Sequence, residues 1–113
     1  MNIETVTVDA DDPAAIAEFW AALLGGEAEV DEDDDVVVRG PGSPELLFQK
    51  VPEGKRVKNR IHLDLRPDDQ AAEVARAEEL GATRVDIGQT ASDTWVVLAD
   101  PEGNEFCILW SRS

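Results

Sequence analysis

Alternating apolar and polar residues occur at two places in the chain, and each is followed by a pattern with helical spacing. The stretch TVTVDADDP begins at Thr5, and the stretch HLDLRPDDQ begins at His62. Alternation with a period of two is typical of a strand with one buried face. Each stretch runs through an acidic turn into a helical segment. The chain therefore repeats one strand–turn–helix pattern, and His62 lies 57 residues after Thr5.

The first helical segment, PAAIAEFWAALLGG, has a strong apolar face. Asp12 is predicted to cap this helix, Pro13 suits its first turn and Gly25 is predicted to end it. Apolar side chains recur every three or four residues, which predicts a buried face. The residues of this face are Ile16, Phe19, Trp20, Leu23 and Leu24.

The second helical segment, DQAAEVARAEELGA, has a weaker apolar face. It is predicted to start after Asp69 and to stop at Gly81. Its predicted apolar face consists of Ala71, Val74, Ala75 and Leu80.

Three strand candidates follow each helix. Turns rich in glycine and proline separate them, notably GPGSP and DPEGN, and the acidic run DEDDD is predicted as a hairpin tip. Each half is therefore a βαβββ unit. The strand candidates are residues 27–30, 35–39 and 45–51 in the first half, and 83–87, 94–99 and 104–110 in the second.

A repeated unit of this size cannot bury its apolar face alone, so the two halves are expected to form one domain. We predict a single domain over 1–113, made of a module 1–52 and a module 59–113 joined by a linker 53–58. The expected fold class is α+β, with curved mixed sheets around a cavity. Such a concavity is a natural place for a small ligand.

Two longer stretches resemble a known family. DDPAAIAEFWAALLG in the first half and DPEGNEFCIL near the end resemble the vicinal oxygen chelate superfamily, which includes glyoxalase I, bleomycin resistance proteins and extradiol dioxygenases. The stretch QKVPEGKRVKNRIHLDLRPDD is similar to small glyoxalase-like proteins of actinobacteria. The resemblance covers nearly the whole chain and is more specific for fold than for reaction. It implies two tandem βαβββ modules, a small-molecule ligand and a homodimer.

The resemblance also implies positions for metal ligands. In metal-using members the first strand of each half usually brings a histidine, and the last strand an acid or histidine. His62 matches, whereas Thr5 is a poor ligand and Cys107 stands where the acid is expected. The counterpart of Cys107 in the first half is Leu47 or, with a slip of two residues, Gln49.

Glu105 lies two residues before Cys107 and shares its face, so it could replace the missing acid. The candidate metal ligands are therefore His62 and Glu105. A catalytic site needs about three protein ligands, so the predicted site is incomplete. No cofactor is expected, and a divalent zinc, nickel, manganese or iron ion is the alternative.

Polar residues on the His62 strand are candidates for catalysis. His62 and Asp64 fall on one face by alternation and could form the polar floor of a pocket, although a hydrogen-bonded sheet histidine fits the pattern too. Trp95, Cys107 and Gln49 are candidate ligand-binding residues. For Cys107 the sequence favours a small buried apolar residue over a functional one.

Charge narrows the possible partners. The net charge is −15, from 25 acids and 10 bases, which disfavours binding to nucleic acid or to anionic lipid. No apolar run approaches the ~20 residues of a membrane span. A single cysteine and the lack of a secretory pattern favour a cytoplasmic location. The basic cluster Lys55, Arg56, Lys58 and Arg60 could capture an anionic group or pair with the chain's own carboxylates.

Two functions remain open from the sequence. The first is a small-molecule-binding protein with an incomplete metal site, as the bleomycin-resistance relatives imply. The second is a metal-dependent lyase, isomerase or dioxygenase-type enzyme acting on a small carbonyl or oxygenated substrate. The sequence does not decide whether the protein is an enzyme.

Overall fold

The computed structural model describes residues 3–31, 34–52, 57, 61–85 and 94–111. The chain divides into two compact units, Met1–Lys55 and Arg56–Ser113. The basic cluster and all of the predicted linker except Val57 lie outside the described residues. Among the described residues, no helix is long and apolar enough to cross a membrane.

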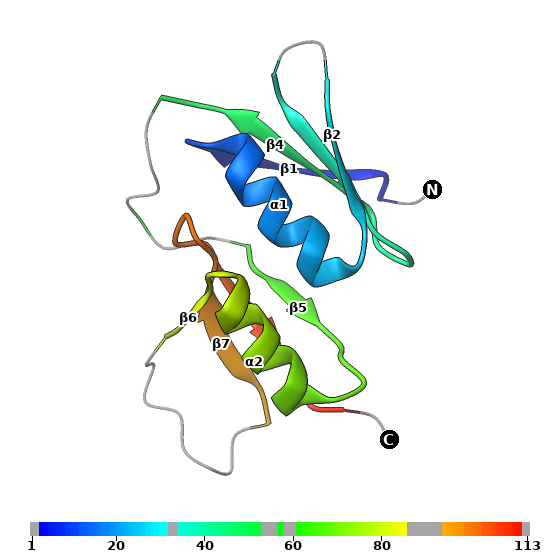
Figure 1. The fold of residues 1–113 in the computed structure, drawn as a ribbon, viewed down its shortest axis with the longest axis vertical. Coiled ribbons are helices and arrows are strands. Elements are labelled where there is room, and N and C mark those ends of the chain that lie inside the picture. Colours follow the sequence, from blue (N-terminus) through cyan, green and yellow to red (C-terminus); the bar gives the residue numbers. More distant parts are fainter. Residues whose placement is uncertain (1–2, 32–33, 53–56, 58–60, 86–93, 112–113) are drawn as a thin grey trace. The chain divides into compact units, whose positions relative to one another are not determined.

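The first unit is a four-stranded mixed sheet with one helix (Figure 1). Strand β1 pairs in parallel with β4, and the remaining pairs are antiparallel, which gives the order β1-β4-β3-β2. The hairpin between β2 and β3 is connected by the acidic run, as predicted, although residues 32–33 lie outside the described residues. The elements are β1 (Thr5–Ala10), α1 (Pro13–Leu24), β2 (Glu27–Val30), β3 (Val36–Arg39) and β4 (Glu45–Lys50).

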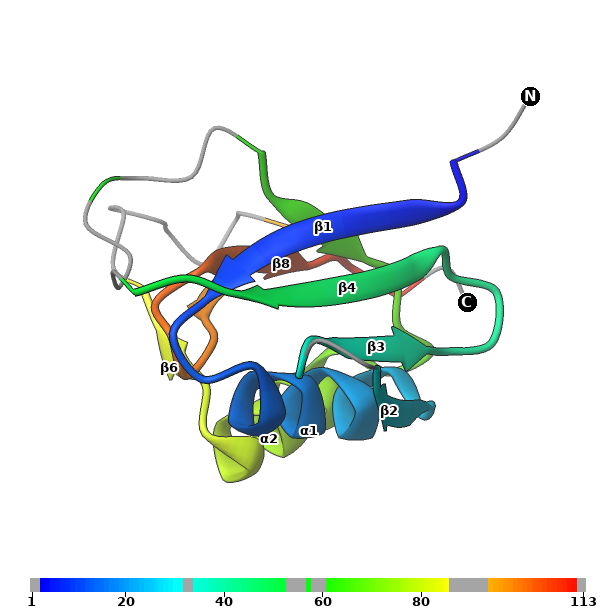
Figure 2. The same ribbon diagram turned by 90° about the horizontal axis from the view of Figure 1, so that it is seen from above.

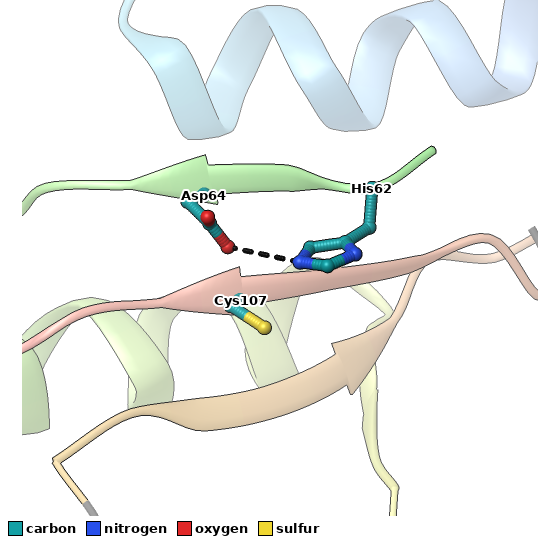
Figure 3. A group of neighbouring side chains, drawn as sticks. All are labelled: His62, Asp64 and Cys107. Atoms are coloured by element: carbon teal, nitrogen blue, oxygen red, sulfur yellow. Dashed lines mark ion pairs between the residues drawn. The ribbon is translucent and has the colours of Figure 1, made fainter. Parts of the chain in front are cut away.

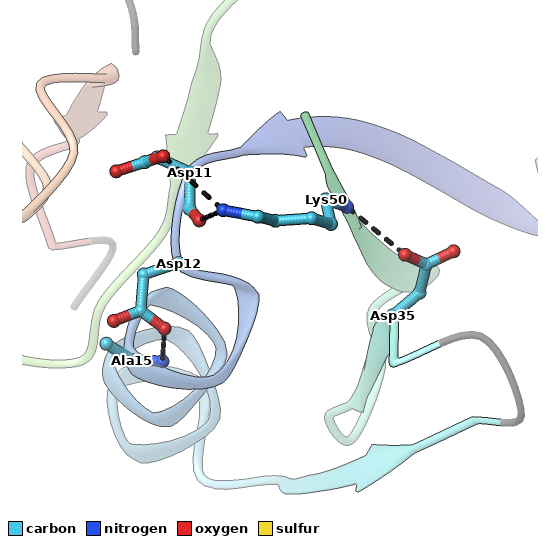
Figure 4. Close-up of polar contacts among 5 residues, drawn as sticks. All are labelled: Asp11, Asp12, Ala15, Asp35 and Lys50. Atoms are coloured by element: carbon cyan, nitrogen blue, oxygen red, sulfur yellow. Dashed lines mark hydrogen bonds and ion pairs between the residues drawn. The ribbon is translucent and has the colours of Figure 1, made fainter. Parts of the chain in front are cut away.

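The ends of α1 form where the sequence predicts them. The side chain of Asp12 accepts a hydrogen bond from the backbone N–H of Ala15 at 3.2 Å (Figure 4). Gly25 ends the helix with a left-handed φ of 68°, a conformation that glycine adopts at little cost. Phe19 and Trp20 are buried and meet edge to face, with ring centroids 5.5 Å apart.

One face of the first sheet packs against α1, as the second view shows (Figure 2). Alternation along the strands buries this face and leaves the other more exposed. The predicted helix face is confirmed, except that Leu24 is only half-buried. The buried sheet residues are Ala10, Val36, Val38, Leu46 and Phe48.

Lys50, at the end of β4, contacts the turn before α1 and the turn before β3 (Figure 4). Its ammonium group donates to the backbone carbonyl of Asp11 and lies 3.5 Å from that residue's carboxylate. Its backbone N–H donates to the carboxylate of Asp35 at 3.1 Å. These contacts use two of the chain's many acids in a structural role.

The second unit repeats this layout. The strand order is β5-β8-β7-β6, with β5 and β8 parallel and the other pairs antiparallel. The two sheets therefore share one topology, and the predicted fold class of two tandem βαβββ modules is confirmed. The elements are β5 (Leu63–Leu65), α2 (Gln70–Leu80), β6 (Thr83–Arg84), β7 (Val96–Ala99) and β8 (Glu105–Ile108).

The predicted apolar face of α2 is partly wrong. Val74 is buried as expected and Leu80 is half-buried, but Ala71 and Ala75 are exposed. Ala77 is buried instead, three residues after Val74. Alanine suits any face of a helix, so its presence did not indicate which side meets the sheet.

The observed strands are shorter than several of the predicted ones. Residue 35, residue 51, residues 94–95 before β7, and residues 104 and 109–110 around β8 lie outside the observed strands. Strand β6 has two residues, and the end of its predicted range lies outside the described residues. Before β8, the DPEGN turn forms its own hydrogen bonds and the strand starts at Glu105.

Candidate functional site

A pocket lies on the face of the second sheet opposite α2. The register pairs Asp64 with Cys107 on β8, and Cys107 in turn with Val97 on β7. Alternation places His62 and Glu105 on this same face. The buried residues of the opposite face, such as Leu98 and Ile108, belong to the core of the unit beneath α2.

The pocket has a volume of about 380 Å³. This is within the range of small-molecule sites, roughly 300–1,000 Å³. All of its lining residues belong to the second unit, so the first unit need not complete it. They are His62, Asp64, Trp95, Val97, Glu105, Phe106, Cys107 and Leu109.

A polar cluster forms one part of this pocket (Figure 3). Nε2 of His62 lies 3.3 Å from Oδ1 of Asp64, and both side chains are about half exposed. The buried Cys107 lies on the neighbouring strand β8, beside the other two residues. One ligand atom from each of the three residues lies within 4.8 Å of the other two. An imidazole nitrogen, a carboxylate oxygen and a sulfur thus converge on one place.

The other part of the pocket is apolar. Trp95 precedes β7 and is 39% exposed, which is unusual for so large an apolar side chain. Val97 and Leu109 also line the pocket. An exposed indole beside aliphatic side chains is a surface on which a flat organic molecule can stack.

Sequence reasoning missed Gln70, which supports the apolar part. Its side-chain amide donates to the backbone carbonyls of Ile108 at 3.0 Å and of Thr94 at 3.1 Å. Its backbone N–H donates to Oγ of Ser111. Gln70 therefore ties the start of α2 to the two strand ends that carry Trp95 and Leu109. The two carbonyls that Gln70 contacts lie 24 and 38 residues away in the sequence, so no local pattern indicates these hydrogen bonds.

The DPEGN turn holds the start of β8. Asp100 is 4% exposed, and its carboxylate accepts hydrogen bonds from the backbone of Glu102 and from both the backbone and the side chain of Asn104. A buried carboxylate needs such partners. The turn's role is to fix the strand that carries Cys107, and its acid is not a pocket residue.

Trp110 lies beyond the pocket lining. The guanidinium of Arg66 is 4.3 Å from the centroid of its ring and donates to its backbone carbonyl at 2.8 Å. The cation–π contact holds the exposed indole in place. Trp110 has therefore a packing partner within its own unit.

The described part of the first unit has no histidine or cysteine at the corresponding positions. If Thr5 corresponds to His62, the register of β1 with β4 makes Leu47 the counterpart of Cys107, because Leu47 pairs with Thr7. Gln49 pairs with Asp9, two residues further along each strand, and is exposed. Its role in ligand binding stays a prediction.

The acid that pairs with Thr5 is Glu45, and it has a structural partner. Arg39 donates to Glu45 at 2.7 Å and to Glu29 at 2.6 Å. The hydrogen bond to Glu45, followed by the one to Glu29, raises the pKa of Arg39 above its ordinary value. Arg39 on β3 thus links Glu45 on β4 to Glu29 on β2.

Glu105, predicted as a metal ligand with His62, lines the pocket but does not belong to the three-donor cluster. Asp64 and Cys107 take the places beside the imidazole instead. Glu105's part in metal binding remains a prediction.

Comparison with known proteins agrees with this architecture. The family model described as "Glyoxalase-like domain" matches residues 5–109. The chain therefore belongs to the glyoxalase-like domain family, within the vicinal oxygen chelate superfamily. A search of curated proteins finds no match.

Solved structures with the same fold are distant in sequence. A glyoxalase/bleomycin resistance protein/dioxygenase family enzyme from Burkholderia phytofirmans is 21% identical, with a TM-score of 0.74, covering 96% of this chain and 97% of that one. The antibiotic binding protein TnmS3 from a Streptomyces species is 20% identical, with a TM-score of 0.70 and coverages of 98% and 96%. A superfamily member from Sphaerobacter thermophilus is 18% identical, with a TM-score of 0.71 and coverages of 98% for both chains. Identities this low show the fold alone.

Proposed function

We propose that this protein binds a small organic molecule in the pocket of its second unit. The main observation in support of this proposal is the pocket itself, which combines an exposed indole with a polar cluster on one sheet face. Trp95 would stack on a flat part of the ligand, and His62 and Asp64 would hydrogen-bond a polar group at its other end. The antibiotic binding protein among the fold relatives supports this class of function.

The volume limits the size of the ligand. A pocket of about 380 Å³ lies at the small end of the range of small-molecule sites, roughly 300–1,000 Å³, which favours a small ligand.

A second candidate function is a metal-dependent enzyme of the lyase, isomerase or dioxygenase type. The observation that favours it is the convergence of His62, Asp64 and Cys107. These residues include the three donor types that zinc accepts, so the cluster fits a transition metal. A bound ion would polarise an oxygen of the substrate. The chain's own side chains would orient that substrate, with Trp95 packing against its apolar part.

Fluorescence tests the binding function. The probe is N-phenyl-1-naphthylamine, a neutral flat molecule whose emission rises in apolar surroundings. We expect saturable binding of one probe per chain that Trp95→Ala weakens about fivefold or more, because an aromatic contact contributes about 0.5–1.5 kcal/mol beyond its buried area. Trp110→Ala is the matched control, since it removes an equally exposed indole outside the pocket.

Two results would contradict the proposal. One is no saturable binding of the probe. The other is equal binding by wild type and Trp95→Ala together with loss in Trp110→Ala, which would move the site away from the pocket.

A homodimer and a joint domain formed by the two modules are further parts of the proposal, supported by the family resemblance. Light scattering of the purified protein would measure twice the chain mass of 12.3 kDa. A monomer at micromolar concentration would argue against it.

A further inference from the structure

We propose that His62, Asp64 and Cys107 form a site selective for thiophilic metal ions, with zinc preferred over magnesium and manganese. The selectivity comes from the sulfur. Thiolate ligands favour zinc and copper(I), whereas carboxylate and water suit magnesium and manganese. A carboxylate at this position would give only nitrogen and oxygen donors, so Cys107 changes which ion the site accepts.

The backbone brings the three donors together. Asp64 and Cys107 are register partners on adjacent parallel strands, and His62 precedes Asp64 by two residues on the same face. None of the three depends on a loop between the two units, since all belong to the second unit. The sheet therefore acts as a template for the donors.

The separations between the donor atoms are close to those found around a bound ion. Bond lengths of ~2.0–2.3 Å place the donors of a tetrahedral zinc site about 3.4 Å apart. The 3.3 Å between Nε2 of His62 and Oδ1 of Asp64 already matches this separation. The largest separation within the cluster, up to 4.8 Å, closes by side-chain rotation, because His62 and Asp64 are half exposed and have room to turn.

The charges also fit. A carboxylate and a thiolate would together neutralise a divalent ion, and the imidazole binds as the neutral base. Three protein ligands leave one position open toward the pocket, which is the arrangement of sites that take an external ligand. This inference concerns the protein without its organic ligand and holds whether or not the proposed binding function is correct.

Cobalt(II) provides the test because it shows a near-ultraviolet charge-transfer band only when a thiolate is bound. Cys107 is the chain's single cysteine and His62 its single histidine, so each signal has one source. Metal-stripped protein is titrated with cobalt, and zinc, manganese and magnesium then compete. We expect one cobalt per chain with the band, displacement by zinc, and at least about tenfold weaker competition by manganese and magnesium.

Variants separate the cluster from the acidic surface. Cys107→Ser should lose the band, and Asp64→Asn should weaken cobalt binding about tenfold or more. Asp68→Asn makes the same chemical change at an exposed position outside the pocket and should bind as wild type does. If Cys107→Ser does not fold, His62→Gln takes its place in the test, because His62 is half exposed and its substitution leaves the core intact.

The proposal is overturned if cobalt binds without the charge-transfer band, or if Asp64→Asn and Asp68→Asn have equal effects, because surface carboxylates would then hold the ion. Equal competition by manganese and zinc, or no cobalt binding at millimolar concentration, would overturn it as well.

Discussion

Asp64 and Cys107 stand directly opposite each other on the parallel strands β5 and β8, one half exposed and the other buried. Their separation is set by the backbone ladder and not by flexible side chains alone. The pair therefore marks the one place where a sulfur is presented beside a carboxylate and an imidazole among the described residues. Ligand binding, metal binding and thiol chemistry at this pocket should all be linked.

Alkylation of Cys107 should report occupancy of the pocket. Cys107 is buried but lines the pocket, so iodoacetamide can reach it only through the pocket. We expect saturating N-phenyl-1-naphthylamine to slow alkylation several-fold, as measured by intact mass. Because the chain has one cysteine, the mass change is unambiguous. Unchanged alkylation at saturating probe would place the probe elsewhere.

Substitution of Gln70 should disturb the pocket from a distance. Gln70→Ala removes two hydrogen bonds to strand-end carbonyls and should lower the free energy of unfolding by about 1–2 kcal/mol. The association constant for N-phenyl-1-naphthylamine should fall too, since the backbone carbonyl of Thr94, next to Trp95, loses its hydrogen bond from Gln70. Urea unfolding and probe titration measure the two effects.

Gln70→Glu sharpens this prediction, because it keeps the size of the side chain but replaces the donor with an acceptor facing two carbonyls. It should be at least as destabilising as Gln70→Ala. A Gln70→Glu protein as stable as wild type would show that these hydrogen bonds do not hold the strand ends.

The buried Asp100 should be needed for stability and not for chemistry. Asp100→Ala leaves three donors without their carboxylate and should cost about 2–3 kcal/mol of unfolding free energy. Asn104→Ala removes only the side-chain donor and should cost less. Asp68→Ala, in an exposed turn, is the control. If urea unfolding gives Asp100→Ala and Asp68→Ala the same free energy of unfolding, the structural role of Asp100 is refuted.

The fold was largely predictable because its signals are local. Strand alternation at Thr5 and His62, the caps at Asp12 and Asp69, and the left-handed glycines Gly25 and Gly81 each act within a few residues. The face of α2 was less predictable, because exposed and buried alanines follow the same spacing. The start of β8 was predicted one residue too early, because the DPEGN turn satisfies its own backbone groups up to Asn104.

The composition of the site was predictable only in part. His62, Asp64, Trp95 and Cys107 were singled out from the sequence, and all four line the pocket. That Asp64 and Cys107, and not Glu105, join the imidazole depends on the register of a parallel pair, and no short turn in the sequence fixes that register.

Nuclear magnetic resonance of the single histidine tests the central claim most directly. The imidazole of His62 gives one set of carbon–proton signals, and the indole N–H groups of Trp95 and Trp110 can be assigned with the Trp→Ala variants. On titration with N-phenyl-1-naphthylamine, the signals of His62 and Trp95 should shift together with one dissociation constant, while that of Trp110 stays in place. Saturable binding that leaves His62 and Trp95 unshifted would contradict the account.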